Sequence, residues 1–184
     1  MRRIALSILA AVLLGGLTAA PAGAAPSTAD DAVREPSAHS VVYRQEAVIA
    51  ADPGAIWRLL VDLNGYAAWN PWVVRAEGDA VPGAEVDVDV MLGSYRMAAT
   101  HVVLAVDPQT RFCWRDAGWN AWFVYGQRCR WLEPRADGTV LLRQELLLDG
   151  VLSPVADHTI GKAMRNGMAA ETAALKARAE QPLP

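Results

Sequence analysis

Two arginines, Arg128 and Arg130, are the most unusual polar residues of this sequence, because they fall in a stretch that is otherwise typical of a buried strand. Side chains two positions apart in a strand point to the same face, and this face also carries Leu132. A pair of guanidinium groups on an apolar face could bind an anionic group, such as the carboxylate of an apolar ligand. Two alternatives remain: the side chains lie at the sheet end and extend to water, or the strand faces are assigned the wrong way round.

A histidine and a tyrosine fall on the same predicted inward face, within the strand that starts near residue 95. His101 and Tyr95 could donate hydrogen bonds to a ligand or transfer protons. The alternative for His101 is a buried core histidine with its hydrogen bonds satisfied. No carboxylate falls on the inward set of the strands between residues 85 and 149, so no acid–base pair is predicted. The sequence also lacks a G-x-S-x-G motif and a phosphate-binding glycine loop.

Two methionines flank a glycine in the C-terminal part of the chain. Met164 and Met168 would lie on one stripe of a helix together with Gly167. Methionine adapts to varied ligands, and a glycine inside a helix costs ~1 kcal/mol relative to alanine unless another group approaches closely. These residues are therefore either ligand contacts or ordinary core.

The two cysteines and three histidines indicate no metal site. His39, His101 and His158 lack metal-ligand spacing, and no C-x-x-C occurs, so no metal and no cofactor is expected. Cys113 and Cys129 would both face the outer side of neighbouring strands. If they lie directly opposite each other, a disulfide could form, closing a loop of about 15 residues and stabilising the fold by ~3 kcal/mol.

The segment from Trp119 to Tyr125 is rich in aromatic side chains and interrupts the strands. It contains Trp119, Trp122, Phe123 and Tyr125. It could act as a gate over a pocket or as an apolar tip that contacts a membrane or a protein partner. The alternative is a lid packed on its own domain.

The elements that must position these residues follow from turns and periodicity. The range 41–50 predicts a first strand, and Asp52-Pro53 predicts an N-cap with proline at N1 of a short helix. A second short helical turn precedes Asn70-Pro71-Trp72. Six more strands follow between residues 72 and 149.

Three hairpins agree on which residues face inward. The turn at Gly93-Ser94 pairs Val90 with Met97, and a turn at Pro108-Gln109 pairs Val103 with Trp114 and Ala105 with Phe112. The turn at residues 135–138 pairs residues of like parity. The inward set is therefore mostly apolar but contains both arginines.

A single helix is predicted for residues 154–180. Apolar or small residues recur in steps of three and four, Pro154 suits the first turn, and Pro182 follows the end. At ~1.5 Å per residue it is roughly 40 Å long, so it must lie on a sheet of similar length. A curved sheet that grips this helix leaves a cavity, because the narrow stripe cannot fill the concave face.

The first 24 residues have the features of a signal peptide. Arg2 and Arg3 precede an apolar run, and Ala22-Gly23-Ala24 is a cleavage pattern. We expect export, to the periplasm or fully secreted, with cleavage near Ala24; the alternative is an uncleaved anchor. Residues 25–40 are predicted to be a disordered leader and 41–181 a single domain. Cleavage leaves 15 basic and 20 acidic side chains, which argues against nucleic acid as a partner.

The chain resembles the START-like (SRPBCC) superfamily. The resemblance covers essentially residues 41–180 and rests on Ala51–Leu63, Tyr66–Trp72, Asp107-Pro108 with Arg111–Arg115, and the glycine-bounded strand 138–150 before the closing helix. It implies an α+β helix-grip fold with about seven antiparallel strands wrapped on the C-terminal helix and two short helices after the first strand. It also implies a pocket for a hydrophobic small molecule. No counterpart to the iron site of the oxygenase members is visible.

Three functions are compatible with these features. The first is an exported protein that binds a hydrophobic or amphipathic small molecule, lipid-like or polyketide-like. The second is a cyclase/dehydrase-type enzyme that uses His101 or Tyr95 for proton transfer. The third is a structural or interaction domain with a filled core. Because no partner for His101 is predicted, binding is preferred over catalysis. The predicted cavity lining is Trp69, Tyr95, Met97, His101, Trp114, Arg128, Arg130, Met164 and Met168.

Overall fold

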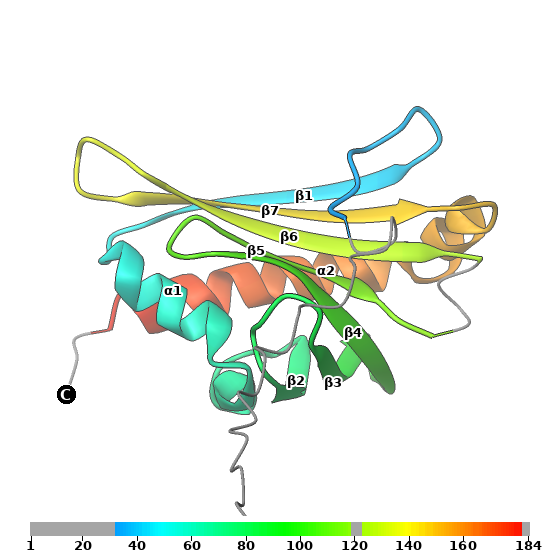
Figure 1. The fold of residues 1–184 in the computed structure, drawn as a ribbon, viewed down its shortest axis with the longest axis horizontal. Helices are drawn as coiled ribbons and strands as arrows, with labels where there is room; N and C mark the ends of the chain where they lie inside the picture. The colour runs from blue at the N-terminus through cyan, green and yellow to red at the C-terminus, as the bar shows by residue number, and fades with distance from the viewer. Residues whose placement is uncertain (1–31, 119–122, 182–184) are drawn as a thin grey trace, which may run out of the picture.

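The computed structural model describes residues 32–118 and 123–181 (Figure 1). The predicted signal peptide therefore lies outside the described residues. The elements in chain order are β1 (Val41–Ile49), α1 (Pro53–Val61), the 3-10 helix η2 (Leu63–Ala68), β2 (Val73–Gly78), β3 (Glu85–Leu92), β4 (Tyr95–Asp107), β5 (Arg111–Asp116), β6 (Tyr125–Pro134), β7 (Val140–Asp149) and α2 (Ser153–Ala179).

The seven strands form one antiparallel sheet in the order β1-β7-β6-β5-β4-β3-β2. The long helix α2 runs along one face of this curved sheet, and α1 lies near the C-terminal end of α2 (Figure 1). Local sequence explains the entry into α1, since the Asp52 side chain accepts a hydrogen bond from Ala55 N at 3.0 Å and proline follows at the first helical position. The predicted helix-grip fold is confirmed.

The hairpin registers follow the predicted turns with one exception. Val90 pairs with Met97 across the Gly93-Ser94 turn, and Val103 pairs with Trp114. The predicted pairing of Ala105 with Phe112 is wrong, because the register shifts between Val103 and Ala105 and sets Ala105 opposite Cys113. A bulge of this kind adds one residue to β4 and increases the local twist.

The core fills the space between the concave sheet face and the helices. One apolar cluster gathers around Tyr66, Trp72, Phe112 and Trp114 beneath Met168 of α2. A second cluster packs α1 against the other end of the sheet and of α2, around Leu175. Since these clusters do not fill the end of the sheet where β5 ends and β6 begins, space remains there for a cavity.

The last residues of the predicted leader contact the outer face of the sheet. Val33 packs against a small cluster that contains Cys113 and Cys129. Arg34 lies over the Tyr125 ring at 3.7 Å, and its backbone N and O both bond to the Gln127 side chain, at 2.7 and 2.9 Å. Val33 and Arg34 therefore contact the domain, while the disorder predicted for residues 25–40 stays a prediction.

Candidate functional site

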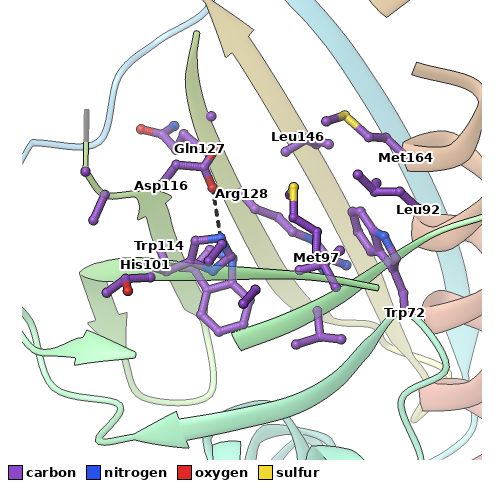
Figure 2. A pocket seen from close by; sticks show the side chains of 18 of the residues that line it. Trp72, Leu92, Met97, His101, Trp114, Asp116, Gln127, Arg128, Leu146 and Met164 are labelled. Atoms are coloured by element: carbon purple, nitrogen blue, oxygen red, sulfur yellow. Dashed lines mark ion pairs between the residues drawn. The ribbon is translucent and has the colours of Figure 1, made fainter. Parts of the chain in front are cut away.

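A cavity of about 400 Å³ lies between the sheet and α2. This volume is in the range of small-molecule pockets. Figure 2 shows His101, Trp114 and Asp116 on one side of it and Met164 of α2, with Leu92 and Trp72, on the other. The lining residues are Trp72, Val73, Val90, Leu92, Met97, Ala98, Ala99, Thr100, His101, Trp114, Asp116, Ala117, Gly118, Gly126, Gln127, Arg128, Leu146, Leu148 and Met164.

Five of the nine predicted lining residues lie in this cavity. They are Met97, His101, Trp114, Arg128 and Met164.

Four predicted residues do not line it. Tyr95 is 68% exposed at the start of β4, so its placement in the pocket is wrong. Its parity is inward, but it lies next to the Gly93-Ser94 turn and its side chain stays at the surface. Trp69 packs edge-on against Tyr66 at 5.1 Å, while Arg130 and Met168 are fully buried beneath the cavity wall.

Arg128 and Arg130 face inward and are paired with a carboxylate from α2. Arg128 Nη1 lies 2.7 Å from Glu171 Oε2, and Arg130 Nη2 lies 3.1 Å from Glu171 Oε1. Arg128 Nη2 also donates to Gln144 Oε1, and Gln144 Nε2 donates to Thr172 Oγ1 at 2.8 Å. The arginines therefore belong to a buried polar network and do not extend to water.

Aromatic rings cover the faces of both guanidinium groups. Arg128 Cζ is 4.4 Å from the centre of the Trp72 ring, and Arg130 Cζ is 4.6 Å from the centre of the Trp114 ring. Cation–π contacts of this kind are stronger when water is excluded. They help to hold two positive charges in the core.

The ionisation of this network reflects competition between burial and charge. Burial alone would raise the pKa of Glu171, but the guanidinium groups of Arg128 and Arg130 outweigh it and hold the pKa below its usual range. Burial and the like charge of Arg130 lower the pKa of Arg128 to about 10. Arg128 and Glu171 are therefore both charged at neutral pH.

His101 has a carboxylate partner, which the sequence analysis did not predict. His101 Nε2 lies 2.8 Å from Asp116 Oδ1, and both residues line the cavity (Figure 2). Asp116 ends β5 and pairs with His101 across the β4–β5 ladder. It shares the inward parity of Trp114, which is the signal in the sequence that could have found it. The prediction that no acid–base pair exists on this face is wrong.

The pairing fixes the hydrogen-bonding state of the imidazole. When Asp116 accepts from Nε2–H, the neutral ring carries its lone pair on Nδ1. His101 is 8% exposed, and Nδ1 has no hydrogen-bond partner among the described residues. The pair therefore leaves a buried ring nitrogen available as an acceptor.

Two glycines make room for side chains of the cavity wall. A Cβ on Gly126 would lie 2.2 Å from Asp116 Oδ2. A Cβ on Gly167 would lie 2.3 Å from the Trp72 ring, which explains the glycine inside α2. Because Gly167 has no side chain, the Trp72 indole can pack directly against the backbone of α2.

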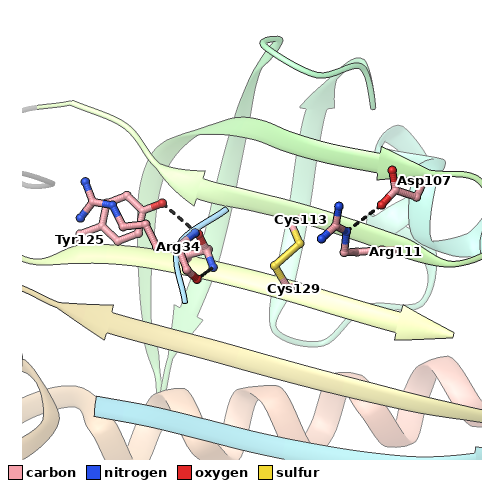
Figure 3. The surroundings of a disulfide bond; sticks show 7 residues. Arg34, Asp107, Arg111, Cys113, Tyr125 and Cys129 are labelled. Atoms are coloured by element: carbon pink, nitrogen blue, oxygen red, sulfur yellow. Dashed lines mark hydrogen bonds and ion pairs between the residues drawn. A yellow bond between two sulfur atoms is a disulfide. The ribbon is translucent and has the colours of Figure 1, made fainter. Parts of the chain in front are cut away.

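Cys113 and Cys129 lie directly opposite each other in the β5–β6 ladder and form a disulfide (Figure 3). Both are buried on the outer face, under Val33. The bond therefore links β5 and β6 covalently, the two strands whose inward residues include Trp114, Arg128 and Arg130.

The aromatic segment is described in part. Trp119 and Trp122 lie outside the described residues. Tyr125 is buried and its hydroxyl hydrogen-bonds Gln127 Oε1 at 3.1 Å, whereas Phe123 is 48% exposed. Within the described ranges, no helix combines the length and the apolar character that a membrane span requires. The same ranges hold no cluster of three or more potential metal ligands.

The family model for polyketide cyclase/dehydrase and lipid transport proteins matches residues 40–180. This match covers the whole sheet, both faces of the cavity and α2. The chain belongs to this family. A search of the curated proteins finds no match.

Solved structures of the superfamily share the fold. The Zhui aromatase/cyclase from Streptomyces sp. R1128 superposes with a TM-score of 0.66 at 16% identity, covering 77% of this chain and 94% of that protein. A START superfamily protein from Mycobacterium smegmatis gives 0.62 at 18% identity, covering 76% and 97%. A truncated norcoclaurine synthase from Thalictrum flavum gives 0.62 at 14% identity, covering 82% and 100%. At these identities the similarity establishes the fold.

Proposed function

We propose that this family member is an exported binding protein for a small amphipathic molecule, lipid-like or polyketide-like. The observation that carries the proposal is that polar and apolar side chains lie on different sides of the cavity wall. In Figure 2 the His101–Asp116 pair lies at one side, whereas Leu92 and Met164 lie at the other. An amphipathic ligand would place its polar group near the pair and Arg128 and its apolar body against the rest.

The third possibility, a domain with a filled core, is disfavoured by the cavity itself. A volume of about 400 Å³ far exceeds the voids that packed protein interiors tolerate. Most of its wall is apolar, so ligand burial would offset the cost of keeping the space open. Contact with a membrane or protein through the 119–125 segment stays a prediction.

Export rests on the N-terminal sequence and agrees with the disulfide. Arg2, Arg3 and the apolar run that follows have the order of a signal peptide, with the cleavage pattern ending at Ala24. Disulfides persist mainly in oxidising compartments. N-terminal sequencing of the protein recovered from the periplasm or the medium would test this, and an intact Met1 in the cytoplasm would overturn it.

A variant that fills the cavity tests ligand binding. Ala99 lines the cavity, and Ala99→Trp should weaken binding of the neutral dye Nile red at least tenfold, because the indole occupies the ligand space. Ala136→Trp in the exposed β6–β7 turn is the matched control and should bind as the wild type does. Native mass spectrometry with extraction would identify any co-purified molecule. A wild-type protein that binds no apolar dye and carries no ligand would refute the proposal.

The His101–Asp116 pair supports a second candidate, an enzyme of the cyclase/dehydrase type. His101 Nδ1 could accept a proton from a carbon or hydroxyl of the ligand, and the imidazolium formed would be stabilised by the Asp116 carboxylate. Tyr95 takes no part, because it is exposed. The geometry thus supplies the titratable pair that an acid–base mechanism needs.

Substitution of His101 by glutamine separates catalysis from binding. If the protein is an enzyme, His101→Gln should lower turnover of a poly-β-ketone thioester roughly 10²- to 10⁴-fold, since a positioned acid or base contributes about that much. Nile red binding should stay within about twofold of wild type. Turnover by wild type that is unchanged in His101→Gln would exclude this role, and absence of any turnover would leave binding as the function.

A further inference from the structure

The buried network of Arg128, Arg130 and Glu171 contains one more positive than negative charge. Both guanidinium groups and the carboxylate are buried, with side-chain exposures of 4%, 0% and 0%. Among the described residues, Glu171 is the only acidic side chain that pairs with either arginine. An uncompensated charge in a low-dielectric interior is costly, because little solvent screens it.

The polar atoms of the arginines that lack a hydrogen-bond partner in this network are all N–H donors. Arg128 Nε, Arg130 Nε and Arg130 Nη1 are buried and have no acceptor among the described residues. Arginine has no acceptor atoms, so only an acceptor group could complete these bonds. Of the two arginines, Arg128 lines the cavity and Arg130 lies behind it. The surplus charge is thus exposed to a ligand through Arg128.

The carboxylate of Asp116 does not cancel this surplus. Its side chain is 38% exposed and its oxygen is paired with His101 Nε2. In Figure 2, Asp116 lies on one side of the cavity, while Trp72, whose ring stacks on Arg128, lies on the other. Solvent therefore screens the charge of the partly exposed Asp116 carboxylate far more than the charge of the buried Arg128 guanidinium.

We infer that the ligand of this cavity is a singly charged organic anion, a carboxylate with an apolar body, whose charge is balanced by Arg128. One surplus positive charge matches one negative charge, whereas a dianionic phosphate would leave an excess of negative charge. The inference rests on the proposed binding function and adds to it the charge of the ligand.

Four compounds that share a ten-carbon chain and differ in the charge of the head group test this inference. Each would displace Nile red from the purified protein, with its disulfide intact, at pH 7 and concentrations below micelle formation. We expect decanoate to displace the dye at a concentration at least tenfold lower than 1-decanol, and decyltrimethylammonium to be the weakest. Decyl phosphate should be weaker than decanoate, and a stronger decyl phosphate would overturn the assignment of a singly charged ligand. This comparison needs no variant.

Replacement of Arg128 by methionine assigns the effect to this residue. Arg128→Met removes the surplus charge and leaves the Arg130–Glu171 pair neutral, so the protein should fold. The preference for decanoate should fall roughly ten- to a hundredfold, the range expected for loss of a charged hydrogen-bonding group. Because Arg128 lines the cavity, the preference is measured as the ratio of decanoate to 1-decanol displacement within the variant itself. Arg111→Met, at the partly exposed ion pair with Asp107 next to the β4–β5 turn, is the charge-matched control and should keep the preference.

The outcomes separate this inference from the function on which it rests. Equal displacement by decanoate and 1-decanol in the wild type would overturn the anionic ligand while leaving the binding function standing. A preference that survives in Arg128→Met would overturn the role of Arg128. Failure of all the compounds and of Nile red to bind would overturn both proposals.

Discussion

Glu171→Gln is expected to lower the free energy of unfolding by about 3–5 kcal/mol, the range found when one partner of a buried ion pair is removed. The substitution keeps the size of the side chain but removes the charge that faces both Arg128 and Arg130. Two guanidinium groups would then share a dry core without a counterion. Urea unfolding followed by tryptophan fluorescence would measure the loss, since Trp72 and Trp114 stack on the arginines.

The same chemical change on the outer face provides the control. Glu145 pairs with Arg44 at 2.9 Å, but the Arg44 side chain is 63% exposed. Glu145→Gln should therefore cost less than about 1 kcal/mol. Combining Glu171→Gln with Arg128→Met should recover part of the stability lost in Glu171→Gln, because one unpaired charge is removed. Equal stability of Glu171→Gln and wild type would show that the buried carboxylate contributes nothing.

Acid should have the same effect as this substitution. The pKa of Glu171 lies below its usual range in the folded protein, so the stabilisation is complete above the pKa of an unfolded glutamate, ~4.3, and is lost as the pH falls through the lower folded value. Glu171→Gln should therefore lose less stability than wild type between neutral and acid pH. Urea unfolding of both proteins at neutral and acid pH would measure this difference.

The faces of the strands could be predicted from sequence because each hairpin turn fixes the parity of the next strand. Gly93-Ser94 sets Met97 opposite Val90, and the parity carries through to Arg128. Periodicity does not predict the bulge near Leu104, where one extra residue shifts the strand pairing. No glycine or proline at this position indicates the shift in the sequence. The cysteines still meet because the β5–β6 pairing lies beyond the bulge.

The chemistry of the site was harder to predict, because strand parity does not say which inward side chains are covered in the folded protein. Tyr95 has the correct parity but lies next to the Gly93-Ser94 turn and is exposed. Glu171 was missed although it falls three residues after Met168 and four before Leu175, on the buried stripe of α2. A carboxylate at such a position, opposite an inward Arg pair, is a signal for a buried ion pair. Neither the helix stripe alone nor the arginine pair alone predicts this ion pair.

The contacts that Val33 and Arg34 make with the sheet could not be predicted from composition. The segment that contains them is polar and short, so composition predicts disorder. The Gln127 side chain bonds both backbone groups of Arg34, and Val33 covers the small apolar patch around the disulfide. These partners are about 80 to 95 residues away in the chain, and only the folded sheet brings them together.

Removal of the disulfide is expected to lower the free energy of unfolding by about 3 kcal/mol in the chain-entropy model. Cys113 and Cys129 are 16 residues apart, so the bond restricts a loop of that size in the unfolded chain. Cys113→Ala with Cys129→Ala should also leave the inward face in place, because Trp114 and Arg128 remain paired by the β5–β6 ladder. The loss should therefore appear in urea unfolding and not in Nile red binding.

Reductant supplies the control for this prediction. Wild type unfolded in urea with dithiothreitol should show the stability of the double alanine variant, and the variant should be insensitive to dithiothreitol. Under native conditions the bond should resist reduction, since both cysteines are buried and Val33 packs against the cluster that contains them. A further variant, Val33→Asp, should make the bond reducible without urea, because it removes the cover and not the bond. If Val33→Asp leaves reduction as slow as in wild type, the leader does not protect the disulfide.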